Sequence, residues 1–155
     1  MSLTGFSKFV LLQRLLGIRN YEGEAATAAA STIGLATPTS VTIGLFLNEP
    51  SKAQVRQEVP DTVGGYQRQP AIFELVEELN KTKAINNNTI IFSVSEELGV
   101  EGYGPVTHAG IFSAEGSLLV YFPIRNESGT DNEPVTVSPG SELSFQPGSI
   151  QVFLD

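Results

Sequence analysis

The chain has no cysteine, no tryptophan and a single histidine among its 155 residues. Without cysteine it cannot form disulfides, thiolate metal sites or a cysteine nucleophile. One histidine leaves almost no material for a histidine-based metal site or catalytic triad. Basic residues are scarce as well, because nine Lys and Arg stand against 17 Asp and Glu, for a net charge of −8. That sign opposes phosphate binding, so we expect no nucleic-acid partner.

Long hydrophobic runs are also missing. The apolar stretch from Phe9 to Leu12 is interrupted by Gln13 and Arg14, and the segment from Leu3 to Leu16 is too short for a span of about 20 residues. We therefore expect no targeting segment and no membrane insertion. Hydrophobic residues make up 41% of the chain and charged residues 17%, which indicates one folded globular domain.

The N-terminal segment predicts an amphipathic helix over 1–17, ending at Gly17, which suits a left-handed helix terminus. Its apolar side chains cover most of the circumference and form a candidate subunit interface: Phe6, Phe9, Val10, Leu12, Leu15 and Leu16. Such a helix must pack on something, either its own domain or a neighbouring subunit. Residues 18–40 follow as a connector of small residues.

From Val41 onward the hydrophobic period changes to two, which is typical of half-buried strands. Pro70 places its extended stretch at a sheet edge or a bulge, whereas Ile72 to Leu79 favours two turns of helix. The pattern predicts a mainly β domain over 41–155, an antiparallel β-sandwich of about seven strands, jelly-roll-like or barrel-like. The apolar runs are 41–47, 66–73, 89–94, 106–113, 118–124, 135–137, 142–145 and 150–154.

Three of the connections between these runs are predicted to be short turns. Glu115-Gly116 is a hairpin candidate between two of them. Pro139-Gly140 and Pro147-Gly148 each fit a type II turn, whose second central residue takes a positive φ.

Few residues of the chain are candidates for catalysis or for metal binding. His108 is expected to be a half-buried structural residue of its strand, because catalysis would need an orienting carboxylate and a nucleophile from elsewhere. Glu96, Glu97 and Glu101 form an acidic loop, which we interpret as solvated rather than as a cation site or a glycosidase pair. The oxygen-rich loop 126–133 lacks the spacing of a calcium loop and is interpreted in the same way. We expect no catalytic residues, no cofactor and no metal.

Five blocks in order resemble the small tailed-phage virion proteins commonly labelled tail fibre or tail proteins. They are the N-terminal helix, Pro38–Phe46 with the Asn-Glu-Pro that follows, Gly64–Gln69, Gly104–Phe112, and Val137–Asp155 with its two Pro-Gly turns. The Gly-Gly-Tyr and Val-Thr-His-Ala-Gly-Ile-Phe sequences are the most specific parts. The acidic stretch from Glu74 to Lys83 departs from that pattern.

The resemblance implies a non-enzymatic structural protein of a tailed-phage virion, associated with the tail, baseplate or neck and made in the host cytoplasm. It would assemble through its β-domain and N-terminal arm, with other copies of itself and other phage structural proteins as partners. The absence of repeats and heptads favours a globular subunit over a fibre shaft.

Three other functions stay open. One is a capsid decoration or cement protein of the phage head. Another is a host-carbohydrate-binding module with Tyr66, Tyr103 and Tyr121 as platforms, although no residue pattern supports a host receptor. The last is a cell-wall-degrading enzyme that would use the glutamates of loop 96–101.

Overall fold

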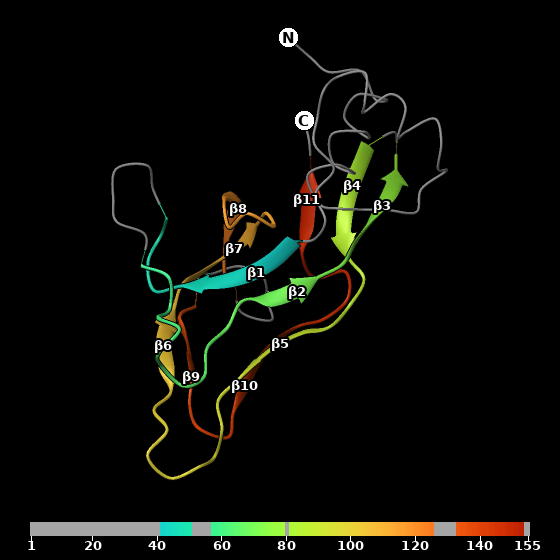
Figure 1. Ribbon diagram of the computed structural model, residues 1–155. Coiled ribbons are helices and arrows are strands. Elements are labelled where there is room, and N and C mark those ends of the chain that lie inside the picture. The colour runs from blue at the N-terminus through green and yellow to red at the C-terminus, as the bar shows by residue number, and fades with distance from the viewer. Residues whose placement is uncertain (1–40, 51–56, 80, 126–132, 154–155) are drawn as a thin grey trace. The chain divides into compact units, whose positions relative to one another are not determined.

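The computed structural model describes residues 41–50, 57–79, 81–125 and 133–153, which form eleven β-strands and no helix (Figure 1). The chain divides into two compact units. Of the described residues, those within 41, 71–89 and 145–153 belong to unit 1, and those within 42–70 and 90–144 belong to unit 2. All pairings whose register is known are antiparallel.

The largest sheet has four strands in the order β2-β1-β7-β8. The strands are β1 (Val41–Phe46), β2 (Gln69–Ala71), β7 (His108–Phe112) and β8 (Leu118–Pro123). β1 and β7 are the inner pair, and five of six residues in β1 and four of five in β7 are buried. Continuous burial along a strand means that both faces of the sheet are covered. The short strand β2 lies at an edge, as Pro70 predicted.

Two smaller sheets each pair two strands. β5 (Ile90–Ser93) pairs with β10 (Glu142–Phe145), and β6 (Tyr103–Val106) pairs with β9 (Val135–Val137). Phe92 of β5 and Val106 of β6 are 1% and 0% exposed, so these sheets contribute to the apolar core.

A three-stranded sheet lies in unit 1, in the order β11-β4-β3. It consists of β3 (Phe73–Glu78), β4 (Lys81–Asn86) and β11 (Gln151–Phe153), which lie side by side in Figure 1. Asn86 is the one polar residue among the buried residues that the structure describes. Its amide nitrogen donates to the carbonyls of Gln146 (2.9 Å) and Asn88 (3.0 Å), and its oxygen accepts from the Ile150 N–H (2.8 Å).

The helix expected over Ile72 to Leu79 was wrong, because that segment forms β3. Phe73 pairs with Asn86 and Glu78 with Lys81. The partner strand of this hairpin therefore hydrogen-bonds backbone N–H and C=O groups, many of which a helix of only two turns would leave unpaired. Leu79 enters the turn with a φ of 50°. β4 itself was missed, because the run Lys-Thr-Lys-Ala-Ile-Asn has no apolar alternation.

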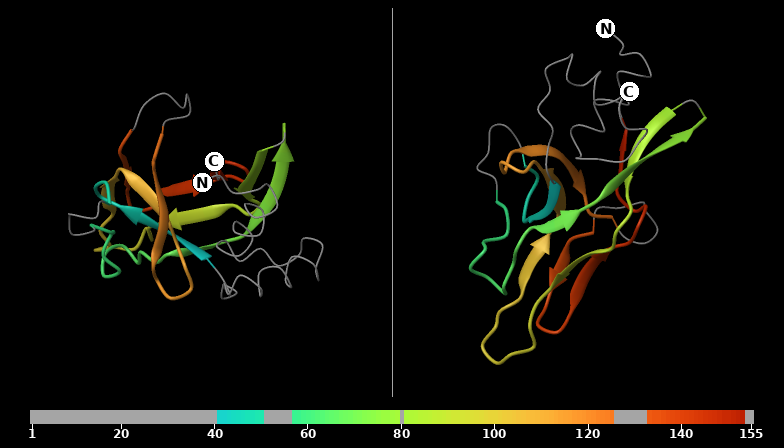
Figure 2. Two further views of the ribbon diagram at one scale, coloured as in Figure 1. Left: turned by 90° about the horizontal axis from the view of Figure 1, so that it is seen from above. Right: turned by 45° about the vertical axis from the view of Figure 1, so that its right-hand side comes forward.

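The predicted turns are confirmed. Gly140 and Gly148 have φ values of 78° and 82°. The closing hydrogen bonds of these type II turns run from Ser141 N–H to Ser138 O (2.9 Å) and from Ser149 N–H to Gln146 O (3.0 Å). The β7–β8 hairpin, which Figure 2 shows in two views, closes through the turn that contains Gly116.

The mainly β, antiparallel class is confirmed, with eleven strands in place of about seven. The arrangement of the sheets as a sandwich, jelly roll or barrel stays a prediction. The expected N-terminal helix, the connector 18–40 and the six candidate interface residues lie outside the described residues. Within the part of the chain that the structure describes, no helix is long and apolar enough to cross a membrane.

Candidate functional site

The best-defined group of interacting polar side chains lies on one face of the four-stranded sheet, above a pair of glycines. Gly44 of β1 and Gly110 of β7 are directly opposite each other in the ladder. A Cβ atom on Gly44 would lie 2.7 Å from the Phe112 ring and 3.1 Å from the Tyr66 hydroxyl oxygen. A Cβ atom on Gly110 would lie 2.8 Å from the Phe46 ring. Glycine is therefore required here, because side chains pack directly on the backbone.

Two aromatic rings form the next layer. Phe46 and Phe112 are stacked with ring centroids 5.8 Å apart, and both are buried. The Arg68 guanidinium carbon lies 3.6 Å from the centroid of the Phe112 ring, which is a close cation–π contact. The Phe112 ring thus contacts both a buried aromatic ring and a cationic side chain.

Arg68 belongs to a hydrogen-bonded group that we call the Tyr-Glu-Arg cluster: Glu58, Tyr66 and Arg68. The guanidinium donates to both carboxylate oxygens of Glu58, from Nε and from Nη2, each at 2.8 Å. The Tyr66 hydroxyl donates to Glu58 Oε1 (3.0 Å) and accepts from the backbone N–H of Leu45 (2.8 Å). The cluster therefore connects the segment 57–68 to β1 through side chains as well as backbone.

The segment that carries Glu58 is held against the end of β1. The Val59 N–H donates to the Leu45 carbonyl (3.0 Å), and the Leu47 N–H donates to the Gln57 carbonyl (2.8 Å). These bonds place the Glu58 carboxylate beside the sheet, within reach of both of its partners.

The surroundings of Tyr66 and Arg68 shift the pKa values of both groups. Burial raises the pKa of Tyr66 far above its ordinary value, with the nearby Glu58 carboxylate adding to the effect. The hydrogen bonds to Glu58 raise the pKa of Arg68. Tyr66 is thus neutral and Arg68 is charged at physiological pH.

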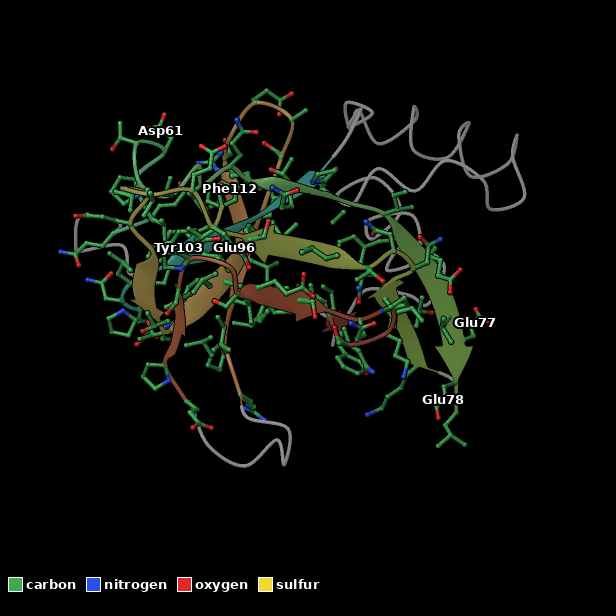
Figure 3. The ribbon with its side chains drawn as sticks, turned by 90° about the horizontal axis from the view of Figure 1, so that it is seen from below. Asp61, Glu77, Glu78, Glu96, Tyr103 and Phe112 are labelled. Atoms are coloured by element: carbon green, nitrogen blue, oxygen red, sulfur yellow. The ribbon has the colours of Figure 1, made fainter. Side chains whose placement is uncertain are left out.

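A pocket of about 490 Å³ opens beside the cluster, lined by Glu58, Val59, Pro60, Asp61, Tyr66, Gln67 and Arg68. Its lining contains no serine, cysteine or histidine nucleophile, and both oxygens of Glu58 are already bound by Arg68. Asp61 is exposed and projects from its loop (Figure 3). The arrangement is suited to holding a surface loop in place.

The acidic side chains of loop 96–101 lie at the surface. Glu96, Glu97 and Glu101 are all exposed, and the Glu96 side chain lies against the Gly140 turn, where an added Cβ would be 2.7 Å from its Oε1. Among the described residues no group of three or more His, Asp or Glu side chains could hold a metal. Loop 126–133 falls almost entirely outside the described residues.

His108 is half-buried in β7, and its structural environment fits the expectation for it. Its Nδ1 lies 2.9 Å from the Thr107 hydroxyl, and its ring packs edge-on against Tyr121 at 6.1 Å between centroids.

Two of the three tyrosines considered as sugar platforms are in the core. Tyr66 and Tyr103 are 3% and 5% exposed and pack edge to face at 5.6 Å, so neither presents a ring to a ligand. Tyr121 is 41% exposed. The carbohydrate-module interpretation thereby loses two of its three platforms.

The Tyr-Glu-Arg cluster was not predicted from the sequence, although three resemblance blocks meet there. Tyr66 and Arg68 belong to the Gly64–Gln69 block, Phe112 to the Gly104–Phe112 block, and Gly44 and Phe46 to the Pro38–Phe46 block. Glu58 lies in no patterned segment, so only the spatial arrangement reveals it.

A comparison with protein families found that residues 19–152 match the family described as Podophage GP4 fiber I protein gp80. A β-rich fold and this match define the class: a tail fibre-type structural protein of a tailed phage. Because the match covers most of its length, the chain belongs to the podophage GP4 fiber I protein gp80 family. Comparisons with curated proteins and with solved structures found no match.

Proposed function

We propose that the chain is a non-enzymatic subunit of the virion, associated with the tail, baseplate or neck. The family match over residues 19–152 is the observation that carries this proposal. The physical character of the described residues supports it. Their best-organised polar group binds its own loop to the sheet, and the carboxylates of loop 96–101 are dispersed in solvent.

We further propose that the subunit assembles through the β-domain 41–155 and the N-terminal arm 1–17, with the sheets packed as a sandwich. A rigid β-domain supplies complementary surfaces, and an apolar terminal segment lets each copy hold a neighbour or another virion protein. The net charge of −8 would keep free subunits apart before assembly and would disfavour contact with the packaged genome.

Immunogold electron microscopy of purified particles, with antibody against this chain, tests the location. We expect gold on the tail, baseplate or neck, and no gold after the antibody is pre-absorbed with the pure protein. Gold spread over the head would instead identify a capsid decoration protein. Protein found only in the lysate would remove the virion role.

The arm is tested by replacing Phe9 and Leu12 with serine, with a double Thr4→Ala, Ser7→Ala variant, which changes two polar residues of the same segment, as the matched control. We expect the Phe9, Leu12 variant to unfold as cooperatively as the wild type and to lose incorporation into particles. Loss of cooperative unfolding would show that the helix belongs to its own domain's core.

A further inference from the structure

One face of the three-stranded sheet in unit 1 is mainly apolar and covered. Directly opposite residues share a face in an antiparallel ladder, so Leu75, Ala84 and Val152 lie side by side across β3, β4 and β11. Ala84 is 0% exposed, and its two neighbours are half-buried. Two more residues complete what we call the covered face, which consists of Phe73, Leu75, Ala84, Asn86 and Val152.

The other face of the same sheet meets solvent. Five of its side chains are exposed: Glu74, Glu78, Lys81, Gln151 and Phe153. An antiparallel sheet with one polar and one apolar face packs its apolar face on a second layer of the domain. The covered face therefore needs a partner layer.

The described residues of unit 1 do not supply that layer. They contain this sheet, the turns around it and single end residues of β1, β2 and β10. The turn that contains Gly148 is bonded to Asn86, at one end of the covered face. Ala84 precedes Asn86 by two residues and so lies further from this turn, yet it is 0% exposed. The cover over Ala84 therefore comes from another part of the chain.

The composition of the remaining stretches narrows the choice. Unit 2 is a compact unit of its own. Residues 51–56 and 126–132 are short and mostly polar, and residues 154–155 are too few to form a layer. Residues 1–40 are the stretch outside the described residues with enough length and enough apolar side chains.

The chain path favours the second half of this stretch. Residues 19–40 end at Val41, and this first residue of β1 belongs to unit 1 while the rest of β1 belongs to unit 2. The chain therefore enters β1 from unit 1. Twenty-two extended residues span up to about 70 Å, against about 20 Å for a strand of the sheet, so the segment is long enough to cross the face. The family match also begins at residue 19 and so includes this segment.

The composition of the segment fits an apolar surface. No charged residue lies between Glu24 and Glu49, and small side chains alternate there with Ile33 and Leu35. Free linkers are commonly rich in glycine and serine, rich in proline, or charged. An uncharged segment rich in alanine instead favours packing, and its small side chains allow a close approach to Ala84.

We propose that residues 19–40 pack on the covered face of their own chain and form the second layer of unit 1. The segment is then a fixed part of the domain rather than a free linker. The consequence for assembly rests on the proposed function: the arm 1–17 starts from the three-stranded sheet, so the virion protein that the arm holds lies next to unit 1.

Photo-cross-linking of the full chain identifies the cover directly. A benzophenone-bearing phenylalanine analogue replaces Leu75 on the covered face or, as the matched control, Val76, which is half-buried in the same strand on the other face. Trypsin releases residues 20–52 as one peptide, because no Lys or Arg lies inside it. We expect fragment sequencing to place the cross-link from position 75 within residues 20–40, and to find no such cross-link from position 76.

Thiol labelling tests the same contact from the side of the segment, since the protein has no cysteine of its own. Leu75→Cys and Val76→Cys are each combined with the double substitution Ile33→Asp, Leu35→Asp. We expect the aspartates to raise the labelling rate of the Leu75→Cys thiol by about tenfold or more, because the segment leaves the face, and that of the Val76→Cys thiol by less than about twofold.

Two controls accompany the labelling. The double substitution Thr4→Asp, Ser7→Asp adds the same charge to the arm and should leave both rates unchanged. Circular dichroism establishes that each variant is folded. Thr82→Cys, half-buried on the same face of β4, replaces Leu75→Cys if the latter unfolds.

A cross-link from position 75 to the arm, to residues of unit 2 or to a second molecule would overturn the proposal, as would no cross-link at all. A labelling rate at position 75 that the aspartates in the segment leave unchanged would overturn it as well. Both measurements use the purified chain, whereas gold labelling locates the chain in the particle. The packing of residues 19–40 and the virion role can therefore fail separately.

Discussion

The four-stranded sheet of unit 2 and the three-stranded sheet of unit 1 are stabilised in different ways. Ile43, Leu45, Ala109 and Ile111, on the inner strands β1 and β7, are all 0% exposed, and the Tyr-Glu-Arg cluster adds an ion pair above Phe112. In the three-stranded sheet, β3 buries only its first residue and β4 only Ala84 and Asn86, and β11 buries none. The first sheet depends on apolar packing, whereas the second depends much more on one buried amide.

The same substitution in both sheets should separate these mechanisms most clearly. Phe112 is 1% exposed and Phe153 of β11 is 50% exposed. Phe112→Ala should lower the free energy of unfolding by about 3–5 kcal/mol, because it leaves a cavity and removes the stacking partners of Phe46 and Arg68. Phe153→Ala should cost less than about 1 kcal/mol. Urea unfolding measures both, and equal losses would contradict the contrast.

The next effect is expected in the three-stranded sheet. Asn86→Ala should cost about 2–3 kcal/mol, because three backbone partners lose their hydrogen bond at a fully buried position. Asn87→Ala, at the exposed neighbouring position, is the matched control and should be nearly neutral. Thermal unfolding of the pair measures the difference. A small loss for Asn86→Ala would show that the amide does not hold β4 to the segment before β11.

The sequence predicted the sheet that is stabilised by apolar packing better than the sheet that depends on hydrogen bonds. The alternation in β1 and the Pro-Gly turns are local signals, so strand and turns were both predicted correctly. β3 and β4 depend on each other's backbone, which the sequence pattern does not show, so the segment from Ile72 to Leu79 was predicted as a helix instead. Asn86 was not singled out, because a sequence does not show which amide will be buried. Glu58 and Arg68 were missed for the same reason, since their contact depends on the folded chain path.

A smaller effect compares the ion pair of each sheet. Glu58→Gln should cost about 1–2 kcal/mol, because Arg68 and Tyr66 lose a charged acceptor in a partly buried cluster. Glu78→Gln, which breaks the exposed pair with Lys83, should cause only a small loss, well below that of Glu58→Gln. Glu78 lies in the last position of β3, and its side chain points away from the ribbon (Figure 3). Similar losses from the two substitutions would mean that the cluster contributes nothing beyond a surface ion pair.

The exposed ion pair of the three-stranded sheet should also depend on pH. The Lys83 ammonium lowers the pKa of Glu78, so the small stability that this pair provides is present above the ordinary glutamate pKa and is lost as the pH falls through the lowered value. Added salt should remove the same contribution. Chemical unfolding of wild type and Glu78→Gln between pH 3 and pH 7 at low salt measures it, and a curve for Glu78→Gln that is steeper than that of the wild type would contradict the sign.

The last prediction concerns how steeply stability falls with pH in alkali. Burial raises the pKa of Tyr66 above its ordinary value of 10.0, so above that pH the unfolded chain releases a proton that the folded chain retains. Stability from Tyr66 is therefore complete below the unfolded pKa and is lost as the pH rises, by up to about 1.4 kcal/mol per pH unit. Tyr66→Phe should lose about 1 kcal/mol at pH 7, through the unpaired Leu45 N–H, and then decline less steeply above pH 10. Tyr121→Phe, at an exposed tyrosine hydrogen-bonded to Glu49, should change that slope much less. If the two variants follow the same alkaline curve, the buried cluster is no more sensitive to deprotonation than the surface.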